Sequence, residues 1–346
     1  MTNNLNELKS LHKMAFGDSD KYIDFFFNNR YESKYCYPEK SNEKIVSVTY
    51  ARIIDLFLNG NKIQIPFLHS IATHNDFRHK GYAKKTITKA LDNLKLEGFP
   101  FVLLHPFKHS FYENLGFTTI SYALKKQINP TPPIIKVNDT GNQKINSDNI
   151  KIESISLKHL DDIDKIYKTK AKQYLAYNNR NLKEWKNILN EHLEDNGFGY
   201  LIYKNMIPIC YILIYSNNEI RELVTLDDNL LNHIDFLDNT SFFEFSKKEA
   251  KYTMGKILSV SKSLYFLPFY DDISSCFNVD YEGELFSIKV EKGKVTAVSK
   301  IVNLDNKKLL QFSKSSLLET IFGLSFLSNT EASIFKDFGL FLFDTY

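Results

Sequence analysis

The stretch HSIATHNDFRHKGYAKKTITKALDNLKLEG, residues 69–98, decides how the rest of the chain is interpreted. It begins as a strand, continues as a basic turn that contains Gly81, and ends as a long amphipathic helix. The helix is predicted over residues 82–97, and Gly98 is typical of its C-terminal stop. Apolar residues recur on one face of it, at Ala83, Ile87, Ala90, Leu91 and Leu94.

The turn before this helix is suited to an anion. The first N–H groups of a helix have no partner within the helix, and the helix dipole adds partial positive charge there. Gly81 lets the backbone approach an oxyanion without a Cβ in between. Basic side chains reinforce the charge, at Arg78, His79, Lys80 and Lys84. The pattern predicts a pyrophosphate site, although a solvated basic turn would have the same sequence.

The residues around this stretch form a mixed α/β pattern. The predicted elements are helices over 5–16 and 19–29, strands over 44–58 and 62–73 joined by a hairpin turn at Asn59-Gly60, a strand over 99–106 and a helix over 110–116. Residues 128–149, INPTPPIIKVNDTGNQKINSDN, then break both the helical and the strand periodicity. They indicate a linker between domains.

The part after the linker repeats the first pattern in degenerate form. Residues 157–175 and 181–193 are predicted as helices and residues 199–226 as strands, without a second basic turn. A third part starts near residue 251. Its predicted elements are a helix over 252–267, antiparallel strands over 276–300, a helix over 313–328 and a terminal strand over 338–346.

Composition limits the classes of protein that fit. The 346 residues exceed one ordinary domain, so we expect two or three. A net charge of +3 is too balanced for a nucleic-acid-binding protein. The cysteines are odd in number and far apart, at Cys36, Cys210 and Cys276, which excludes a disulfide framework or a metal-type pair.

No apolar run reaches the roughly 20 residues needed to span a bilayer, and the N-terminus is not a signal peptide. We expect a cytoplasmic protein without membrane or nucleic-acid partners.

Two motifs carry a resemblance to the GCN5-related N-acetyltransferases. FRHKGYA (77–83) matches their R/Q-x-x-G-x-G/A signature, and FYENLGF (111–117) resembles their F-Y-x-x-x-G-F segment. HSIATHND looks like their splayed fourth strand. The resemblance implies acetyl-CoA as co-substrate. Its pantetheine arm would bind the backbone around Ile71, Ala72 and Thr73. Its pyrophosphate would bind the turn that begins at Arg78 and comprises His79, Lys80, Gly81, Tyr82, Ala83 and Lys84.

By the same resemblance, Tyr112 is the predicted catalytic acid. A phenol near the thioester sulfur can protonate the departing thiolate. The alternative is a tyrosine packed under the sheet whose hydroxyl donates a hydrogen bond to a backbone carbonyl.

His105 and His109 have the i, i+4 spacing of metal ligands. Pro106 lies between them, in a segment that ends a strand, so we expect no metal.

The whole chain resembles the enhanced intracellular survival (Eis) type of this family. The implied fold is α/β (α+β), with tandem acetyltransferase-fold domains, the second degenerate, and a C-terminal sterol-carrier-protein-like α+β domain. The corresponding boundaries are residues 1–128 for the acetyl-CoA-binding domain, 129–149 for the linker, 150–250 for the degenerate domain and 251–346 for the last. The resemblance also implies a homo-oligomer, a trimer of dimers, and a terminal carboxylate, here that of Tyr346, as catalytic base.

The implied activity is transfer of an acetyl group from acetyl-CoA to a primary amine of a small cationic molecule or protein. Two other functions fit the resemblance less well. One is a non-catalytic lipid- or ligand-binding protein that works through its sterol-carrier-like domain. The other is a peptidyl transferase acting on aminoacyl-tRNA, which the near-neutral charge does not favour.

Overall fold

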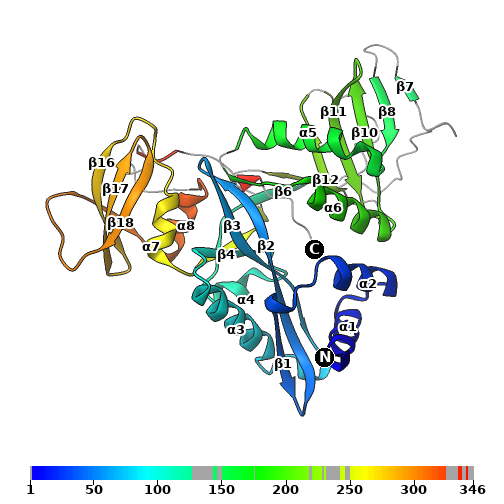
Figure 1. Cartoon of the computed structure of the whole chain (residues 1–346), viewed down its shortest axis with the longest axis horizontal. Helices are drawn as coiled ribbons and strands as arrows, with labels where there is room; N and C mark the ends of the chain where they lie inside the picture. Colours follow the sequence, from blue (N-terminus) through cyan, green and yellow to red (C-terminus); the bar gives the residue numbers. More distant parts are fainter. Residues whose placement is uncertain are drawn as a thin grey trace.

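The computed structural model describes residues 2–126, 143–145, 150–174, 176–217, 220–227, 230, 242–245, 250–324, 334–336 and 340–341. Figure 1 shows three parts, coloured blue to cyan, green, and yellow to orange along the chain. The elements of the first part are α1 (Thr2–Phe16), α2 (Asp20–Asn29), β1 (Cys36–Ser41), β2 (Lys44–Leu58), β3 (Asn61–Thr73), α3 (Tyr82–Leu96), β4 (Phe101–Leu104), α4 (His109–Glu113), β5 (Thr118–Thr119) and β6 (Tyr122–Lys126).

The predicted elements of the first part are confirmed. β2 and β3 form a long antiparallel hairpin, and Asn59 and Gly60 turn it with φ angles of 47° and 79°. Both central residues of a type I′ turn need such positive values, which is why this dipeptide predicted the hairpin. The apolar face of α3 packs on the sheet with Ile87, Ala90, Leu91 and Leu94 buried. Helices α1 and α2 lie beside the sheet away from α3 (Figure 1).

The sheet of the first part also contains strands from later in the chain. Its order is β20-β9-β2-β3-β4-β15-β5, and β1 pairs with β2. The recruited strands are β9 (Ala176–Asn178), β15 (Met254–Ile257) and β20 (Leu340–Phe341). The sheet of the first part is therefore completed by strands that lie far along the chain, from residue 176 onward.

β15 corrects one prediction. Residues 252–267 were expected to be a helix, but residues 254–257 pair with both β4 and β5, and only α7 (Val260–Ser263) and a 3₁₀ turn are helical. The partners of this segment explain the difference, because β4 and β5 pair with it on both sides. Gly255 allows close packing there, since a Cβ would stand 3.1 Å from Leu103 Cδ2. A boundary at residue 251 therefore places β15 with the third part, although its pairing partners belong to the first.

The second part contains the predicted helices and strands. They are β8 (Ile150–Ser154), α5 (Leu160–Ala171), α6 (Leu182–Glu194), β10 (Phe198–Lys204), β11 (Ile207–Ile214) and β12 (Ile220–Thr225). The sheet has the order β12-β11-β10-β8-β7, with β7 at Gln143–Ile145. A smaller sheet joins β6 to β13 (Phe242–Phe245) and β14 (Ala250–Lys251). α5 and α6 pack around Trp185, which is fully buried.

The third part is an antiparallel meander with one parallel strand. Its sheet has the order β18-β17-β16-β19, and the bounds are β16 (Ser275–Tyr281), β17 (Glu284–Glu291), β18 (Lys294–Lys300), β19 (Lys308–Phe312) and α8 (Lys314–Ile321). One apolar cluster joins this sheet and α8 to the first part through Ile54, Phe67 and Phe101. The strands predicted over 276–300 are confirmed, and the likeness to sterol carrier protein stays a prediction. Among the described residues, no helix is long and apolar enough to cross a membrane.

Candidate active site

The predicted phosphate turn is exposed and leads into α3. His79 and Gly81 have φ angles of 61° and 82°, and Gly81 is the N-cap residue of α3. Glycine has no side chain to cap the helix, so the first amides of α3 face outward without a side-chain acceptor. Arg78 Nε donates to the carbonyl of Thr73 at 3.3 Å, and Lys80 Nζ donates to the carbonyl of Asp76 at 2.8 Å. The turn is thus tied to the end of β3.

Helix α3 is fixed on the sheet behind this turn. The hydroxyls of Thr86 and Thr49 are 2.8 Å apart, and both residues are buried. Gly81 and Lys84 line a shallow depression that continues along α3 past Lys85 and Lys89. Lysines therefore continue the positive charge of the turn along one exposed face of the helix as far as Asp92, while the free amides are confined to its first turn.

β3 and β4 separate beside this turn. They pair only at Phe67 with Leu103 and Leu68 with Leu104. Beyond that point the register of β3 against β2 shifts, and Ser70 has a φ of 45°, so the strand carries a bulge. Among the described residues, nothing on β4 pairs with the rest of β3, which includes Ile71, Ala72 and Thr73. The predicted cofactor strand is thus splayed from its neighbour.

Tyr112 lies at this opening. It sits on α4, 2% exposed, with its ring packed edge-on against Phe111 at 5.0 Å and Phe117 at 5.9 Å. Within the described residues its hydroxyl makes no hydrogen bond, so the alternative of a phenol bonded to a backbone carbonyl finds no partner there. Burial raises the pKa of Tyr112 above its ordinary value.

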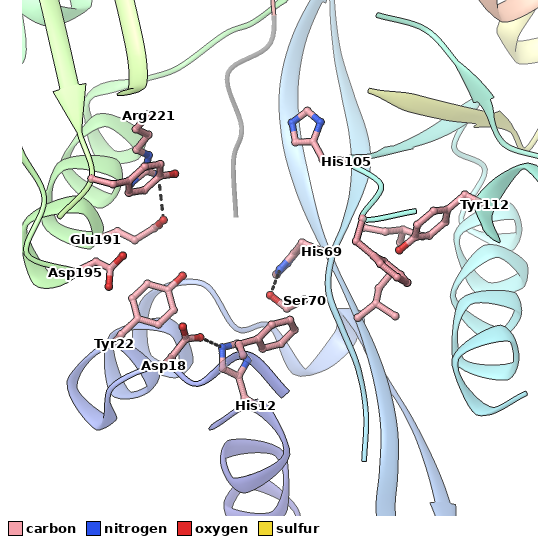
Figure 2. A pocket seen from close by; sticks show the side chains of 15 residues that line it. His12, Asp18, Tyr22, His69, Ser70, His105, Tyr112, Glu191, Asp195 and Arg221 are labelled. Atoms are coloured by element: carbon pink, nitrogen blue, oxygen red, sulfur yellow. Dashed lines mark hydrogen bonds and ion pairs between the residues drawn. The ribbon is translucent and has the colours of Figure 1, made fainter. Parts of the chain in front are cut away.

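A cavity of about 370 Å³ joins this opening to the second part of the chain. Figure 2 shows Tyr112 on one side of it, His69 and Ser70 of β3 in the middle, and Glu191, Asp195 and Arg221 on the other side. The lining residues are His12, Phe16, Asp18, Tyr22, Leu68, His69, Ser70, Ile71, His105, Phe107, Tyr112, Glu191, Asp195, Tyr215 and Arg221. Of the predicted site residues, the cavity therefore brings together Ile71 and Tyr112.

The sequence analysis missed the opposite side of this cavity. His12 lies on α1 and Asp18 lies in the loop between α1 and α2, where His12 Nε2 is 2.9 Å from Asp18 Oδ2. Glu191 and Asp195 come from α6 and its C-cap. More than 170 residues separate Asp18 from these two, roughly half the chain. No local pattern links them, and only the packing of α6 beside α2 brings them into one cavity (Figure 2).

Two further histidines, His69 and His105, line the cavity beside His12. His69 is 6% exposed and stacks on Tyr50, and its pKa lies well below the ordinary value, first because of burial and then because of Arg52 and Arg30. It is therefore uncharged at neutral pH. His105 Nδ1 lies 3.4 Å from the Thr253 hydroxyl. Among the described residues, no three potential ligands gather as a metal site would require.

The remaining predicted site residue cannot be placed. Tyr346, which the resemblance assigns as catalytic base, lies outside the described residues. The last described residues before it are Leu340 and Phe341, whose strand β20 pairs in parallel with β9 at the edge of the first sheet.

Comparisons with known proteins agree with this geometry. Residues 2–120 match the family described as an acetyltransferase (GNAT) domain. The comparison with curated proteins gives no significant match. Among solved structures, a GCN5-related N-acetyltransferase from Anabaena variabilis is similar with a TM-score of 0.74 and 16% identity, over 100% of this chain and 98% of that one.

Two further structures are similar over the same shares of both chains, 100% and 98%. A probable N-acyltransferase from Enterococcus faecalis has a TM-score of 0.73 and 14% identity. Eis1 from Mycobacterium abscessus has a TM-score of 0.67 and 11% identity. At these identities the likeness concerns the fold. It covers all three parts of the chain, and the acetyltransferase domain itself occupies the first.

Proposed function

We propose that the protein is an acetyl-CoA-dependent N-acetyltransferase that acts on a primary amine of a small cationic molecule or protein. One observation carries the proposal. A single cavity passes the splayed end of β3, with Tyr112 on the side of the cofactor turn and carboxylates on the other. A thioester and an amine entering from opposite sides would meet there.

The residues of the first part would hold the cofactor. We assign the pyrophosphate to the turn from Arg78 to Lys84, because its amides at the start of α3 lack side-chain partners. We assign the pantetheine arm to the backbone of Ile71 and Thr73, which β4 leaves unpaired. An extended arm can pair with such a strand as an added strand would. The thioester would then lie beside Tyr112.

The reaction needs two proton movements. The nitrogen lone pair of the neutral amine attacks the thioester carbon, the C–S bond breaks, and the sulfur leaves as a thiolate. Tyr112 donates its proton to that sulfur, and the nitrogen loses a proton to solvent or to a base. The phenol regains its proton afterwards. Because the raised pKa keeps Tyr112 protonated at neutral pH, it is present in the form that a proton donor requires.

The opposite side of the cavity suits a positively charged acceptor. Asp18 and Asp195 both line it, and carboxylates attract the ammonium form in which an amine of pKa about 10.4 arrives at neutral pH. The free thiols of Cys36, Cys210 and Cys276 fit a reducing compartment. We therefore place this activity in the cytoplasm.

Cofactor binding is tested by a matched pair of glycine variants. Gly81 and Gly60 have φ angles of 82° and 79°, and a Cβ at either position would have nothing within 4 Å. Alanine therefore strains the backbone similarly at both sites. We expect Gly81→Ala to weaken acetyl-CoA binding about tenfold, since it alters the anion turn. Gly60→Ala should bind as the wild type does.

Isothermal titration calorimetry with acetyl-CoA measures both variants. Equal affinities for Gly81→Ala and the wild type would remove the phosphate assignment. A wild-type protein that does not bind acetyl-CoA at all would instead favour the non-catalytic ligand-binding protein.

A further inference from the structure

We infer that the second domain selects the acceptor, and that the Asp195 carboxylate binds a second positive group of the acceptor at the end of the cavity away from Tyr112. This inference rests on the proposed function. The inference concerns which amines the enzyme accepts. Asp195 would be a specificity-determining residue, and it comes from the part of the chain in which the sequence has no second basic turn.

Glu191 is not available for this role, because two arginines already hold it. Arg30, at the C-cap of α2, donates to Glu191 Oε2 through Nε at 3.1 Å and Nη2 at 2.8 Å. Arg221 of β12 donates to Glu191 Oε1 at 3.1 Å. All three side chains are less than 10% exposed. Arg30 also pairs with Glu184, so the cluster fixes α6 against α2 and leaves Glu191 neutralised.

Asp195 differs from Glu191 in this respect. Within the described part of the chain its carboxylate has no hydrogen-bond donor or ion-pair partner. Its pKa is raised first by burial and then by the negative charges of Asp18 and Glu191, while Arg221 acts in the opposite direction. Asp18 contacts the imidazole of His12. Both carboxylates line the same cavity, so a cation bound there would face two negative charges.

Backbone hydrogen bonds hold the turn around Asp195, from Asp195 N to the Glu191 carbonyl at 3.1 Å and from Gly197 N to the His192 carbonyl at 2.8 Å. Asn196 has a φ of 56°, and the loop turns at once into β10. His192 Nε2 lies 2.9 Å from the carbonyl of Phe198, and the His192 ring would stand 2.3 Å from a Cβ at Gly197. A side chain at position 197 would therefore collide with the His192 ring.

The acceptor must be extended to use both ends of the cavity. Figure 2 shows Asp195 and Asp18 with Tyr22 on one side, and Tyr112 on the other, with β3 in between. An acceptor whose reacting nitrogen lies near Tyr112 would carry its second charge at the opposite end. Linear diamines have this form. Phe16 and Tyr22 add aromatic faces near the two aspartates, which favours an organic cation over a metal ion.

The test compares two acceptors of equal length, 1,5-diaminopentane and 5-amino-1-pentanol, which differ only in the distal ammonium. We expect the wild type to favour the diamine by roughly tenfold in kcat/KM, and Asp195→Asn to bring that ratio close to one. Asp161→Asn is the matched control, because Asp161 is an exposed aspartate of the same domain on α5 that does not line the cavity. It should keep the wild-type ratio.

Any result other than the expected one contradicts the inference. Equal use of both acceptors by the wild type, or equal losses for both in Asp195→Asn, would overturn the role of Asp195 while amine acetylation stands. Acetylation of neither acceptor, together with acetyl-CoA binding, would instead overturn the proposed function and the inference with it.

Discussion

Replacing Tyr112 by phenylalanine is expected to lower kcat by roughly a hundredfold while acetyl-CoA binds as before. The change removes only the hydroxyl, which within the described residues bonds to no other group, so packing against Phe111 and Phe117 is kept. General acid catalysis of this kind contributes about 10² or more. Stopped assays of acetylated product at saturating substrates measure kcat directly.

Tyr37→Phe is the matched control for this variant. Tyr37 belongs to the same apolar cluster as Tyr112 and is 4% exposed, but it does not line the cavity. Its buried hydroxyl has no hydrogen-bond partner among the described residues. Its kcat should equal that of the wild type. If Tyr112→Phe and Tyr37→Phe turn over equally fast, the phenol of Tyr112 is structural.

The pH dependence of kcat provides a second test of Tyr112 as the catalytic acid. Burial raises its pKa, so the phenol keeps its proton to higher pH than a free tyrosine, whose pKa is about 10. The acid form is therefore present throughout pH 6–9. We expect no loss of kcat as the pH rises through this range, and a descending limb below pH 9 would point to a different acid.

Glu222→Ala is expected to lower the free energy of unfolding of the protein by about 3–5 kcal/mol, the range for breaking a buried ion pair. Arg180 donates to Glu222 through Nη1 at 2.7 Å and Nη2 at 3.0 Å, with both side chains at most 2% exposed. The Tyr211 hydroxyl also bonds to this carboxylate. Alanine would remove the carboxylate that accepts hydrogen bonds from the buried Arg180 guanidinium and from the buried Tyr211 hydroxyl.

The fluorescence of Trp185, the only tryptophan of the chain, can be used to measure this loss of stability. Trp185 lies in the same core, with the Arg180 guanidinium 4.5 Å from its ring. Urea unfolding followed by its fluorescence should show the midpoint falling in Glu222→Ala. The triple variant Arg180→Met, Glu222→Leu, Tyr211→Phe removes every partner at once and should regain most of the lost stability. An unchanged midpoint in Glu222→Ala would mean that the pair contributes little.

Local patterns predicted the part of the site that is built locally. The hairpin at Asn59-Gly60, the helix after Gly81 and the short helix that carries Tyr112 each depend on residues within one segment. Turn chemistry and helical periodicity determine such elements without help from distant contacts. The family match to residues 2–120 concerns this same segment.

The missed features depend on distant contacts. β15 is a strand because β4 and β5, more than 130 residues earlier, offer it hydrogen bonds on both sides. The acceptor side of the cavity depends on Arg30 reaching Glu191 across 161 positions of the sequence. A single sequence gives no signal for such pairings, since any surface arginine or glutamate has the same local appearance.

The most direct test of the proposed activity is the release of free thiol from acetyl-CoA in the presence of a primary amine. With purified protein, acetyl-CoA and 1,5-diaminopentane, we expect thiol to appear in step with monoacetylated diamine, and much more slowly with Tyr112→Phe. Thiol release that does not depend on the amine, or none with any amine while acetyl-CoA binds, would contradict an amine acetyltransferase.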